Sequence, residues 1–282
     1  MSVTFRGADL SAPISIGSMG KYSDNTPYLK TEHWREIVEH ADTATVVEHD
    51  LDGLLVSLST IQSINDARGG MYGHGIRNLI LPYIPGARQD RFNPTGDVTS
   101  MLKTVASVIN VLDFVNVLVL DPHSEQAGYH INHMVAYPLE RVYAHLPHDY
   151  LGVITPDKGA KLRSIIAYGA VGAKELKQAS KVRDVSTGRL TGFEVESLTP
   201  GGHYLVADDI CDGGGTFVGL GEKIAEQGAT ADLFVTHGIF SKGIHELQKY
   251  YNTIYTTNSM QLIREVHVKR FDIVTEMENY NV

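Results

Sequence analysis

The stretch LVADDICDGGGTFVG, from Leu205 to Gly219, joins an apolar run to three acids and a row of glycines. The acids are Asp208, Asp209 and Asp212, and a helical pattern follows the glycines. Glycines after a strand let backbone N–H groups converge on an anion, and the helix that follows adds its positive N-terminal end. The stretch therefore predicts a strand, an anion-binding turn and a helix in succession.

The acids and the glycines suit different parts of a phosphorylated sugar. Asp208 and Asp209 would repel a phosphate, but they can accept hydrogen bonds from vicinal sugar hydroxyls or hold a metal ion. The glycine amides and the hydroxyl of Thr216 suit the phosphate, and Thr216 is also suited to cap the helix. The competing interpretation is a plain strand-to-helix turn with solvated acids, which the paired acids disfavour.

Similar units recur along the chain, because apolar runs repeatedly end in polar loops and are followed by helical patterns. Apolar strands that alternate with helices predict an α/β fold of parallel sheets flanked by helices, with ligands at the carboxyl ends of the strands. We expect two similar domains, residues 1–142 and 143–282, and a hairpin or flap within 177–202. The predicted strands cover 77–85, 115–123, 150–159, 203–211, 231–240 and 253–259.

Composition limits the function classes. The net charge is −9 and no basic run is present, which disfavours nucleic-acid binding. No apolar run approaches the ~18 residues of a membrane span, and the first residues do not resemble a secretory signal. The single cysteine, Cys211, excludes an internal disulfide and is typical of a buried small residue in a cytoplasmic protein. We therefore expect a cytoplasmic protein with no nucleic-acid or membrane partner.

Several motifs resemble the ribose-phosphate diphosphokinase (phosphoribosyl-diphosphate, PRPP, synthetase) family. VADDICDGGGT (206–216) resembles the PRPP loop that this family shares with type I phosphoribosyltransferases. PYIPGARQDR (82–91) is similar to an ATP-contacting motif of the synthetases, and LDPHSEQAGY (120–129) resembles their metal-binding histidine segment. Transferases lack the last two motifs. The resemblance implies two phosphoribosyltransferase-like domains, the first binding ATP and the second binding ribose phosphate.

The resemblance also implies roles for residues outside the glycine turn. Without it, the ARQDR loop, His123 and the SKVRD cluster would be interpreted as solvated or structural, and Asp157 as a helix cap. His123 and Asp157 would bind Mg²⁺, and Lys181 and Arg183 in the flap would be the catalytic cations. The remaining residues are the ATP contacts Arg88, Gln89, Asp90, Arg91 and His123, and the ribose-phosphate contacts Asp208, Asp209, Asp212, Gly213, Gly214, Gly215 and Thr216.

Two departures from the family affect these expectations. The family has an N-terminal Phe-x-Asp-Gly-Glu segment, and only DLDG (50–53) resembles it, with Leu54 in place of Glu. The family also has Thr where this chain has Gly213, and the glycine removes a hydroxyl that would bind the sugar 5-phosphate. Losing one hydrogen bond to a charged group costs roughly 1.5–3 kcal/mol. A bulkier ester of the 5-phosphate, such as ADP-ribose, would instead benefit from the added space.

The expected reaction is a Mg²⁺-dependent transfer of the β,γ-diphosphate of the co-substrate ATP to the anomeric hydroxyl of ribose 5-phosphate. It would yield AMP and PRPP, for nucleotide or NAD synthesis. Three alternatives remain open: the same chemistry on ADP-ribose, a phosphoribosyltransferase reaction, and a non-catalytic regulatory homologue. The family pattern also predicts a homo-oligomer.

Overall fold

The computed structural model describes residues 3–16, 19–68, 75–91, 100–183, 190–260 and 268–280. The chain forms two compact units, Met1–Tyr137 together with Val274–Val282, and Pro138–Ile273. The predicted division between residues 142 and 143 falls inside helix α5 (Leu139–Tyr143). Among the described helices, none is long and apolar enough to cross a membrane.

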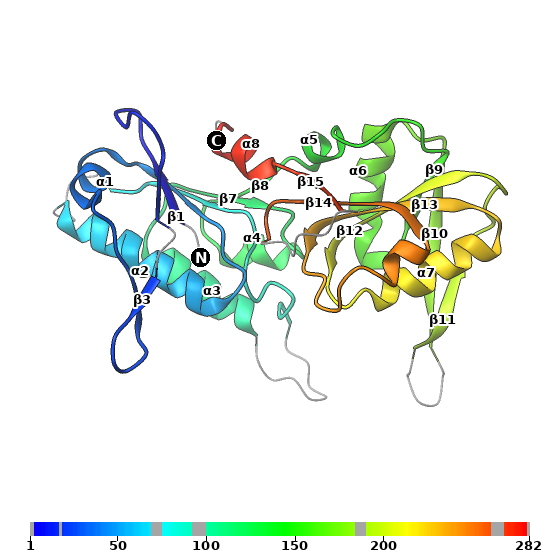
Figure 1. Ribbon diagram of the computed structural model, residues 1–282, viewed down its shortest axis with the longest axis horizontal. Helices are drawn as coiled ribbons and strands as arrows, with labels where there is room; N and C mark the ends of the chain where they lie inside the picture. The colour runs from blue at the N-terminus through cyan, green and yellow to red at the C-terminus, as the bar shows by residue number, and fades with distance from the viewer. Residues whose placement is uncertain are drawn as a thin grey trace. The chain divides into compact units, whose positions relative to one another are not determined.

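Each unit is built on a mostly parallel sheet, which confirms the predicted fold class (Figure 1). In the first unit the strand order is β2-β1-β5-β6-β7-β8. Strands β5 to β8 run parallel, whereas β1 pairs antiparallel with both β2 and β5. The strands are β1 (Val3–Arg6), β2 (Ile14–Ile16), β5 (Thr43–Val46), β6 (Asn78–Leu81), β7 (Asn116–Leu120) and β8 (Met134–Tyr137), with a separate two-stranded hairpin of β3 (Met19–Lys21) and β4 (Pro27–Leu29).

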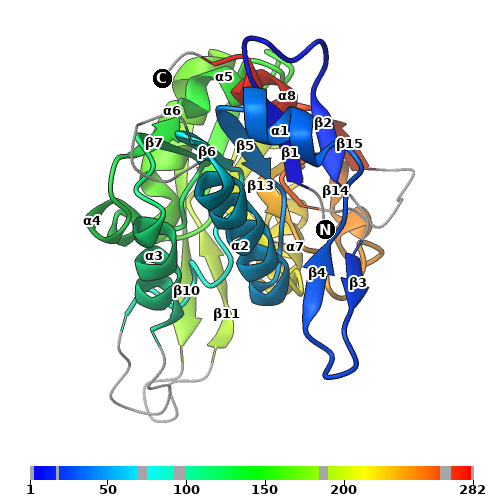
Figure 2. The same cartoon turned by 90° about the vertical axis from the view of Figure 1, so that its left-hand side faces the viewer.

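The longest helices of the first unit connect neighbouring parallel strands. Helix α2 (Leu51–Ala67) links β5 to β6, and α3 (Met101–Val111) links β6 to β7. Both connections run in the same direction along the sheet, so right-handed crossovers place the two helices on one face, where they lie next to each other (Figure 2). The unit also contains α1 (Trp34–His40) and α4 (Gln126–His130), and most of α8 (Ile273–Glu278).

The DLDG stretch forms the beginning of helix α2. Asp50 is the N-cap, and its side chain accepts a hydrogen bond from the Gly53 amide at 2.7 Å. The carboxylate thereby satisfies a backbone donor that has no partner inside the helix. In this chain the DLDG stretch therefore acts as a helix cap.

The second unit has a seven-stranded sheet in the order β11-β10-β9-β12-β13-β14-β15. All pairs are parallel except β10 with β11, which form the hairpin predicted within 177–202. The strands are β9 (Gly152–Thr155), β10 (Glu175–Arg183), β11 (Leu190–Val195), β12 (His203–Cys211), β13 (Thr230–Gly238), β14 (Tyr251–Thr257) and β15 (Val268–Phe271).

The helices of this unit are α5, α6 (Lys161–Val171) and α7 (Gly215–Glu226), with short 3-10 turns η1 (Lys158–Ala160) and η2 (Leu247–Lys249). Between β13 and β14 the chain forms only the short turn η2. Gly243 has a φ of 72°, outside the helical region, and β14 begins at Tyr251. Little chain is left between these two points, so a single short turn forms.

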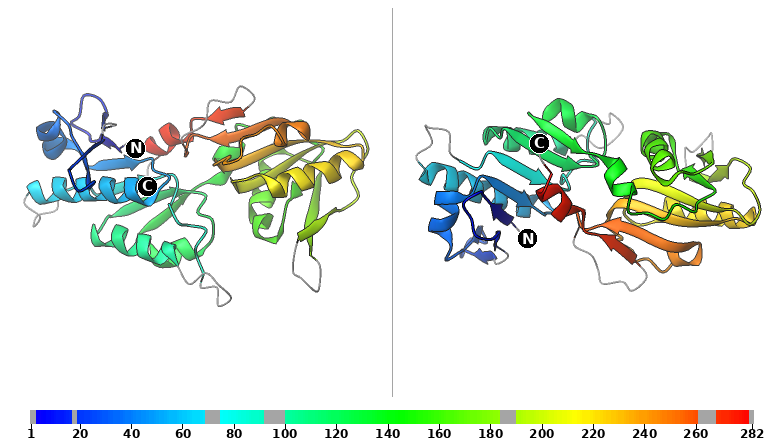
Figure 3. Two further views of the ribbon diagram at one scale, coloured as in Figure 1. Left: turned by 60° about the horizontal axis from the view of Figure 1, so that its bottom comes forward. Right: turned by 90° about the horizontal axis from the view of Figure 1, so that it is seen from above.

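The strand order reverses between β9 and β12. From β9 the chain passes through α6 to β10 on one side, and from β12 it passes through α7 to β13 on the other. Right-handed crossovers in opposite directions put α6 and α7 on opposite faces of the sheet (Figure 3). Open α/β sheets bind ligands at such a switch point, outside the carboxyl ends of the strands. In the second unit this position lies beside the ends of β9 and β12.

Candidate functional site

The carboxyl end of β12 carries a pair of acids in a low-dielectric environment. Asp209 is 5 % exposed, and its carboxylate lies 3.5 Å from the guanidinium of Arg163 on helix α6. Burial raises the pKa of Asp208, and the negative charges of Asp209 and Asp157 raise it further. The sequence motif predicted the acids, but the cation that balances Asp209 comes from a helix far away in the chain and was not predicted.

Asp157 stands at the end of β9, next to β12 in the sheet. Its Oδ1 accepts hydrogen bonds from the amides of Gly159 at 2.9 Å and Ala160 at 3.3 Å, so it caps η1. The cap interpretation is confirmed, and the metal-ligand role of Asp157 stays a prediction. Over the described part of the chain, no group of three His, Cys, Asp or Glu side chains could hold a metal ion.

The glycines after β12 occupy three different environments. Gly214 has a φ of 76° and is the N-cap of α7, a backbone conformation that favours glycine. A Cβ at Gly215 would meet nothing within 4 Å. Gly213 has no left-handed φ, and a Cβ there would make only ordinary contacts, at 3.5 Å from the Lys242 side chain. The backbone therefore requires a glycine at 214 but not at 213.

Thr216 does not cap helix α7, contrary to the prediction. The helix already begins at Gly215, and Val218 donates its amide to the Gly214 carbonyl at 2.9 Å. The left-handed conformation of Gly214 starts the helix before the threonine is reached. Thr216 thus lies in the first turn, where its hydroxyl is still a candidate for contact with an anion.

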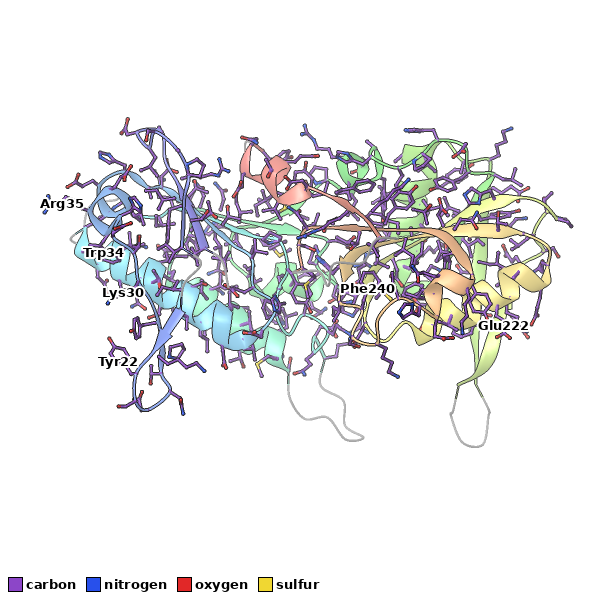
Figure 4. All side chains as sticks on the ribbon, viewed as in Figure 1. Tyr22, Lys30, Trp34, Arg35, Glu222 and Phe240 are labelled. Carbon is purple, nitrogen blue, oxygen red and sulfur yellow. The ribbon has the colours of Figure 1, made fainter. Side chains whose placement is uncertain are left out.

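The loop after β13 is bound directly to the glycine turn. The amides of Ile239 and Phe240 donate to the Cys211 carbonyl at 2.9 and 3.0 Å, and Ser241 Oγ donates to Asp212 Oδ1 at 2.6 Å. Phe240, labelled in Figure 4, is buried and has a φ of 47°, which is rare for a bulky residue. No role was predicted for Ser241 from the sequence.

Cys211 ends β12 inside the core of the second unit. Its thiol is fully buried, and burial together with the charges of Asp212 and Asp208 raises its pKa to about 12. A thiol in this state is protonated at neutral pH and is a poor nucleophile. The expected role as a small buried residue is confirmed.

In the first unit a tight turn presents the predicted ATP contacts. Pro85 and Gly86 are its central residues, Gly86 has a φ of 82°, and the Ala87 amide donates to the Ile84 carbonyl at 3.1 Å. Proline followed by a left-handed glycine is the pattern of a type II turn. The side chains that follow are exposed for Arg88, Gln89 and Arg91 and half-buried for Asp90, whose carboxylate lies 3.5 Å from Arg91 Nε.

His123 follows the neighbouring strand β7 in the same sheet. Leu81 of β6 pairs in parallel with Val119 of β7, so the loops that carry Arg88 and His123 leave the same edge of the sheet. Asp121, between β7 and His123, is 4 % exposed and has a φ of 40°. This strained, buried aspartate was not predicted, because a left-handed aspartate has no signature in a single sequence.

The two predicted catalytic cations lie at the end of strand β10. The backbones of Lys181 and Arg183 pair with Phe193 and Leu190 of β11, and their side chains lie outside the described part of the structure. The register shifts between Val182 and Arg183, which interrupts the simple alternation of strand side chains. The expectation that the two cations point the same way therefore stays a prediction.

The chain is similar in sequence to several ribose-phosphate pyrophosphokinases. The enzyme of Pyrococcus furiosus is 27% identical over 281 residues, which cover 95% of this chain and 93% of that protein. The enzyme of Pyrococcus abyssi is 26% identical over 265 residues, with 85% and 82% coverage. No family model matches the chain.

The fold also has a solved counterpart. The crystal structure of phosphoribosylpyrophosphate synthetase from Mycobacterium smegmatis superposes with a TM-score of 0.73 at 18% identity, covering 93% of this chain and 87% of that one. At this identity the likeness concerns the fold, and it confirms the two-sheet α/β architecture. Together with the sequence matches along most of the chain, it shows that the protein is similar to ribose-phosphate pyrophosphokinases in sequence and in fold.

Proposed function

We propose that the protein transfers the β,γ-diphosphoryl group of ATP to the anomeric hydroxyl of ribose 5-phosphate. The oxygen of that hydroxyl bonds to the β-phosphorus of ATP, the bond between the β-phosphorus and the α,β-bridging oxygen breaks, and the hydroxyl proton is released. AMP and PRPP are the products. The observation that carries the proposal is the group of acids joined to a glycine turn and a helix N-terminus at the switch point of the second sheet.

The acceptor site is divided between the acids and the glycine turn. Asp208, Asp209 and Asp212 accept hydrogen bonds from the ribose hydroxyls, and Asp209 is held in place by Arg163. The amides of 213–216 and the N-terminus of α7 receive the 5-phosphate. The carboxylates lie on β12 and directly after it, whereas the phosphate is bound by the turn that follows. The negative groups are thereby kept apart.

Residues of the first unit bind ATP in this proposal. The exposed guanidinium groups of Arg88 and Arg91 suit an adenine face or phosphate oxygens, and Gln89 offers an amide edge. Lys181 and Arg183 neutralise charge on the transferred diphosphoryl group. Such reactions depend mostly on positioning and on charge stabilisation.

Asp157 and His123 are the proposed Mg²⁺ ligands. A carboxylate at the end of β9 is chemically suited to the ion, although imidazole is a less typical ligand for it. Magnesium is usually held by one or two carboxylates, substrate phosphates and water, so a cluster of three protein ligands is not needed. The ion would supply charge neutralisation for the phosphates of ATP.

ADP-ribose is a second candidate acceptor, and the conformation of Gly213 favours it. Because the backbone does not require a glycine there, the missing side chain is best explained by the ligand. An acceptor whose 5-phosphate carries an adenylyl group needs more room at this point than ribose 5-phosphate. The rest of the proposed chemistry is the same.

The test is AMP release from ATP and Mg²⁺ in the presence of ribose 5-phosphate, of ADP-ribose, or of no acceptor, with the products identified by mass spectrometry. We expect acceptor-dependent AMP and an acceptor heavier by one diphosphoryl group. Consumption of PRPP with a nucleobase, without AMP release from ATP, would instead indicate a phosphoribosyltransferase. Binding of nucleotide without any turnover would indicate a regulatory homologue.

A further inference from the structure

Position 213 has no side chain of its own, and the space beside it is lined by another residue. The three atoms closest to a Cβ built on Gly213 all belong to Lys242: Cδ and Cε at 3.5 Å and Cγ at 3.8 Å. The aliphatic part of Lys242 therefore lies against the glycine turn, and its ammonium group is one bond beyond Cε. Lysine side chains commonly bury their stems in this way and keep the charge in water.

Lys242 is exposed, and within the described part of the chain its ammonium makes no hydrogen bond or ion pair. Two other lysines of this unit differ in this respect. Lys223 and Lys249 each form an ion pair with a glutamate three residues away, at 2.7 Å. Lys242 thus presents an available positive charge at the edge of a turn suited to an anion.

The backbone holds Lys242 in this position. Its neighbour Ser241 donates its hydroxyl to Asp212 and its amide to the Asp212 carbonyl, at 2.6 and 3.2 Å. Phe240 adopts a left-handed conformation at the start of the same loop, and Gly243 adopts one at its end. Strained conformations of this kind persist only where surrounding structure enforces them, and they cluster at ligand-binding sites.

We propose that Lys242 is a specificity-determining residue that binds a phosphate group of the acceptor at the 213–216 turn. The absence of a side chain at 213 lets the ammonium reach the phosphate oxygens over the glycine. The ligand is a sugar phosphate, and its phosphate is either the 5-phosphate monoester of ribose 5-phosphate or the diphosphate of ADP-ribose. The inference rests on the proposed function, because it places the acceptor phosphate at this turn.

The test compares Lys242→Met with Lys249→Met, two variants with the same change of side chain and of net charge. Methionine keeps an apolar stem against Gly213 and removes the ammonium. Isothermal titration calorimetry with ribose 5-phosphate and with ADP-ribose measures acceptor binding without turnover. We expect Lys242→Met to weaken binding of the acceptor by about 10- to 100-fold, the effect of losing one hydrogen bond to a charged group. Lys249→Met should change it less than about twofold.

The pattern of loss identifies the phosphate. A loss confined to ribose 5-phosphate assigns Lys242 to the monoester, and a loss confined to ADP-ribose assigns it to the diphosphate. Lys242→Arg should restore most of the affinity, and Lys242→Gln, which also removes the charge, replaces the methionine variant as the test if that variant does not fold. Equal affinities of the Lys242 and Lys249 variants for both acceptors would overturn the inference.

The same data separate this inference from the proposed function. If the wild-type protein releases AMP but binding is indifferent to Lys242, the reaction stands and the role of Lys242 is rejected. If no AMP is released but acceptor binding depends on Lys242, the phosphate site stands and the reaction is rejected. Failure of the wild-type protein to bind either acceptor would reject both.

Discussion

At the scale of single residues, two adjacent glycines have different reasons to be glycine. Both lie in the 213–216 turn that is proposed to bind the acceptor phosphate. Gly214 needs its left-handed φ of 76° to begin helix α7, whereas Gly213 has an ordinary backbone and room for a methyl group. The sequence alone does not distinguish the roles of these two glycines. The structure assigns one to backbone geometry and leaves the other to be explained by the ligand.

Substitution by alanine should distinguish these reasons. Gly214→Ala should lower the free energy of unfolding by about 1–2 kcal/mol, the cost of a left-handed conformation for a residue with a Cβ. Gly213→Ala should leave it unchanged or raise it by up to about 1 kcal/mol, because alanine has fewer unfolded conformations to lose. Urea denaturation followed by circular dichroism measures both. Equal losses in the two variants would contradict this assignment.

The flap cation Lys181 is predicted to act on the reacting diphosphoryl group rather than on ATP binding. Lys181→Ala should therefore lower kcat by about 10²–10³-fold, a typical effect of removing one charge-stabilising group, with little change in ATP affinity. The matched control is Lys177→Ala in the same strand, where the lysine forms an ion pair with Glu175 at 3.3 Å. Steady-state AMP release gives kcat, and normal turnover of the Lys181 variant would reject the role of the flap.

At the scale of elements, loops rather than strands assemble the site. The loop after β13 reaches back to Cys211 and Asp212 through backbone and side-chain hydrogen bonds. In the first unit, a turn at Gly86 ends a buried segment, and Arg88 directly after it is exposed. The sheets provide the fixed edges from which these loops start, and this separation of scaffold and site is typical of α/β proteins.

The beginning of helix α2 offers a test of one element assignment. Asp50→Ala should lower the free energy of unfolding by about 1 kcal/mol, because the Gly53 amide loses its cap at the helix N-terminus. Asp66→Ala, in the last turn of the same helix, should leave stability unchanged or raise it slightly, since an acid there opposes the helix dipole. Urea denaturation measures both variants. An unchanged free energy of unfolding in Asp50→Ala would show that Asp50 is not a helix cap in solution.

At the scale of the whole molecule, each unit has its own core and its own sheet. In the second unit, a cluster of three polar side chains, Tyr150, His203 and Asp232, lies at the amino ends of the strands. Tyr150 donates to Asp232 at 2.8 Å, and His203 lies 3.4 Å from the same carboxylate and stacks on the Tyr150 ring. The hydrogen bond to Asp232 raises the pKa of His203 above its ordinary value, against the opposing effect of burial.

This histidine makes stability depend on pH. A group whose pKa is raised on folding contributes stability that is fully present below its unfolded pKa, about 6.5, and is lost as the pH rises through its folded pKa. His203→Gln should therefore destabilise the protein more at about pH 5.5 than at about pH 8.5. Urea denaturation at both pH values measures the difference, with His245→Gln as an exposed control. A cost of His203→Gln that is equal at both values would contradict the assignment.

Local patterns in the sequence predicted much of the fold and part of the site. The strand expected at 203–211 has the observed bounds, and the flap expected within 177–202 is an antiparallel hairpin. These features follow from short-range physics: apolar runs form buried strands, and glycines and acids mark where they end. The strands expected over 77–85 and 150–159 are shorter in the structure, Asn78–Leu81 and Gly152–Thr155.

The sequence by itself determined the α/β class, the strand ends and the grouping of acids with glycines in one turn. Tertiary structure alone decided which distant residues complete that turn: Arg163 beside Asp209, Ser241 on Asp212, and Lys242 against Gly213. These contacts depend on β9, β12 and β13 lying next to each other in parallel, an arrangement that buries their apolar side chains. Periodicity along a chain records which side chains are buried, but it does not record which strands become neighbours.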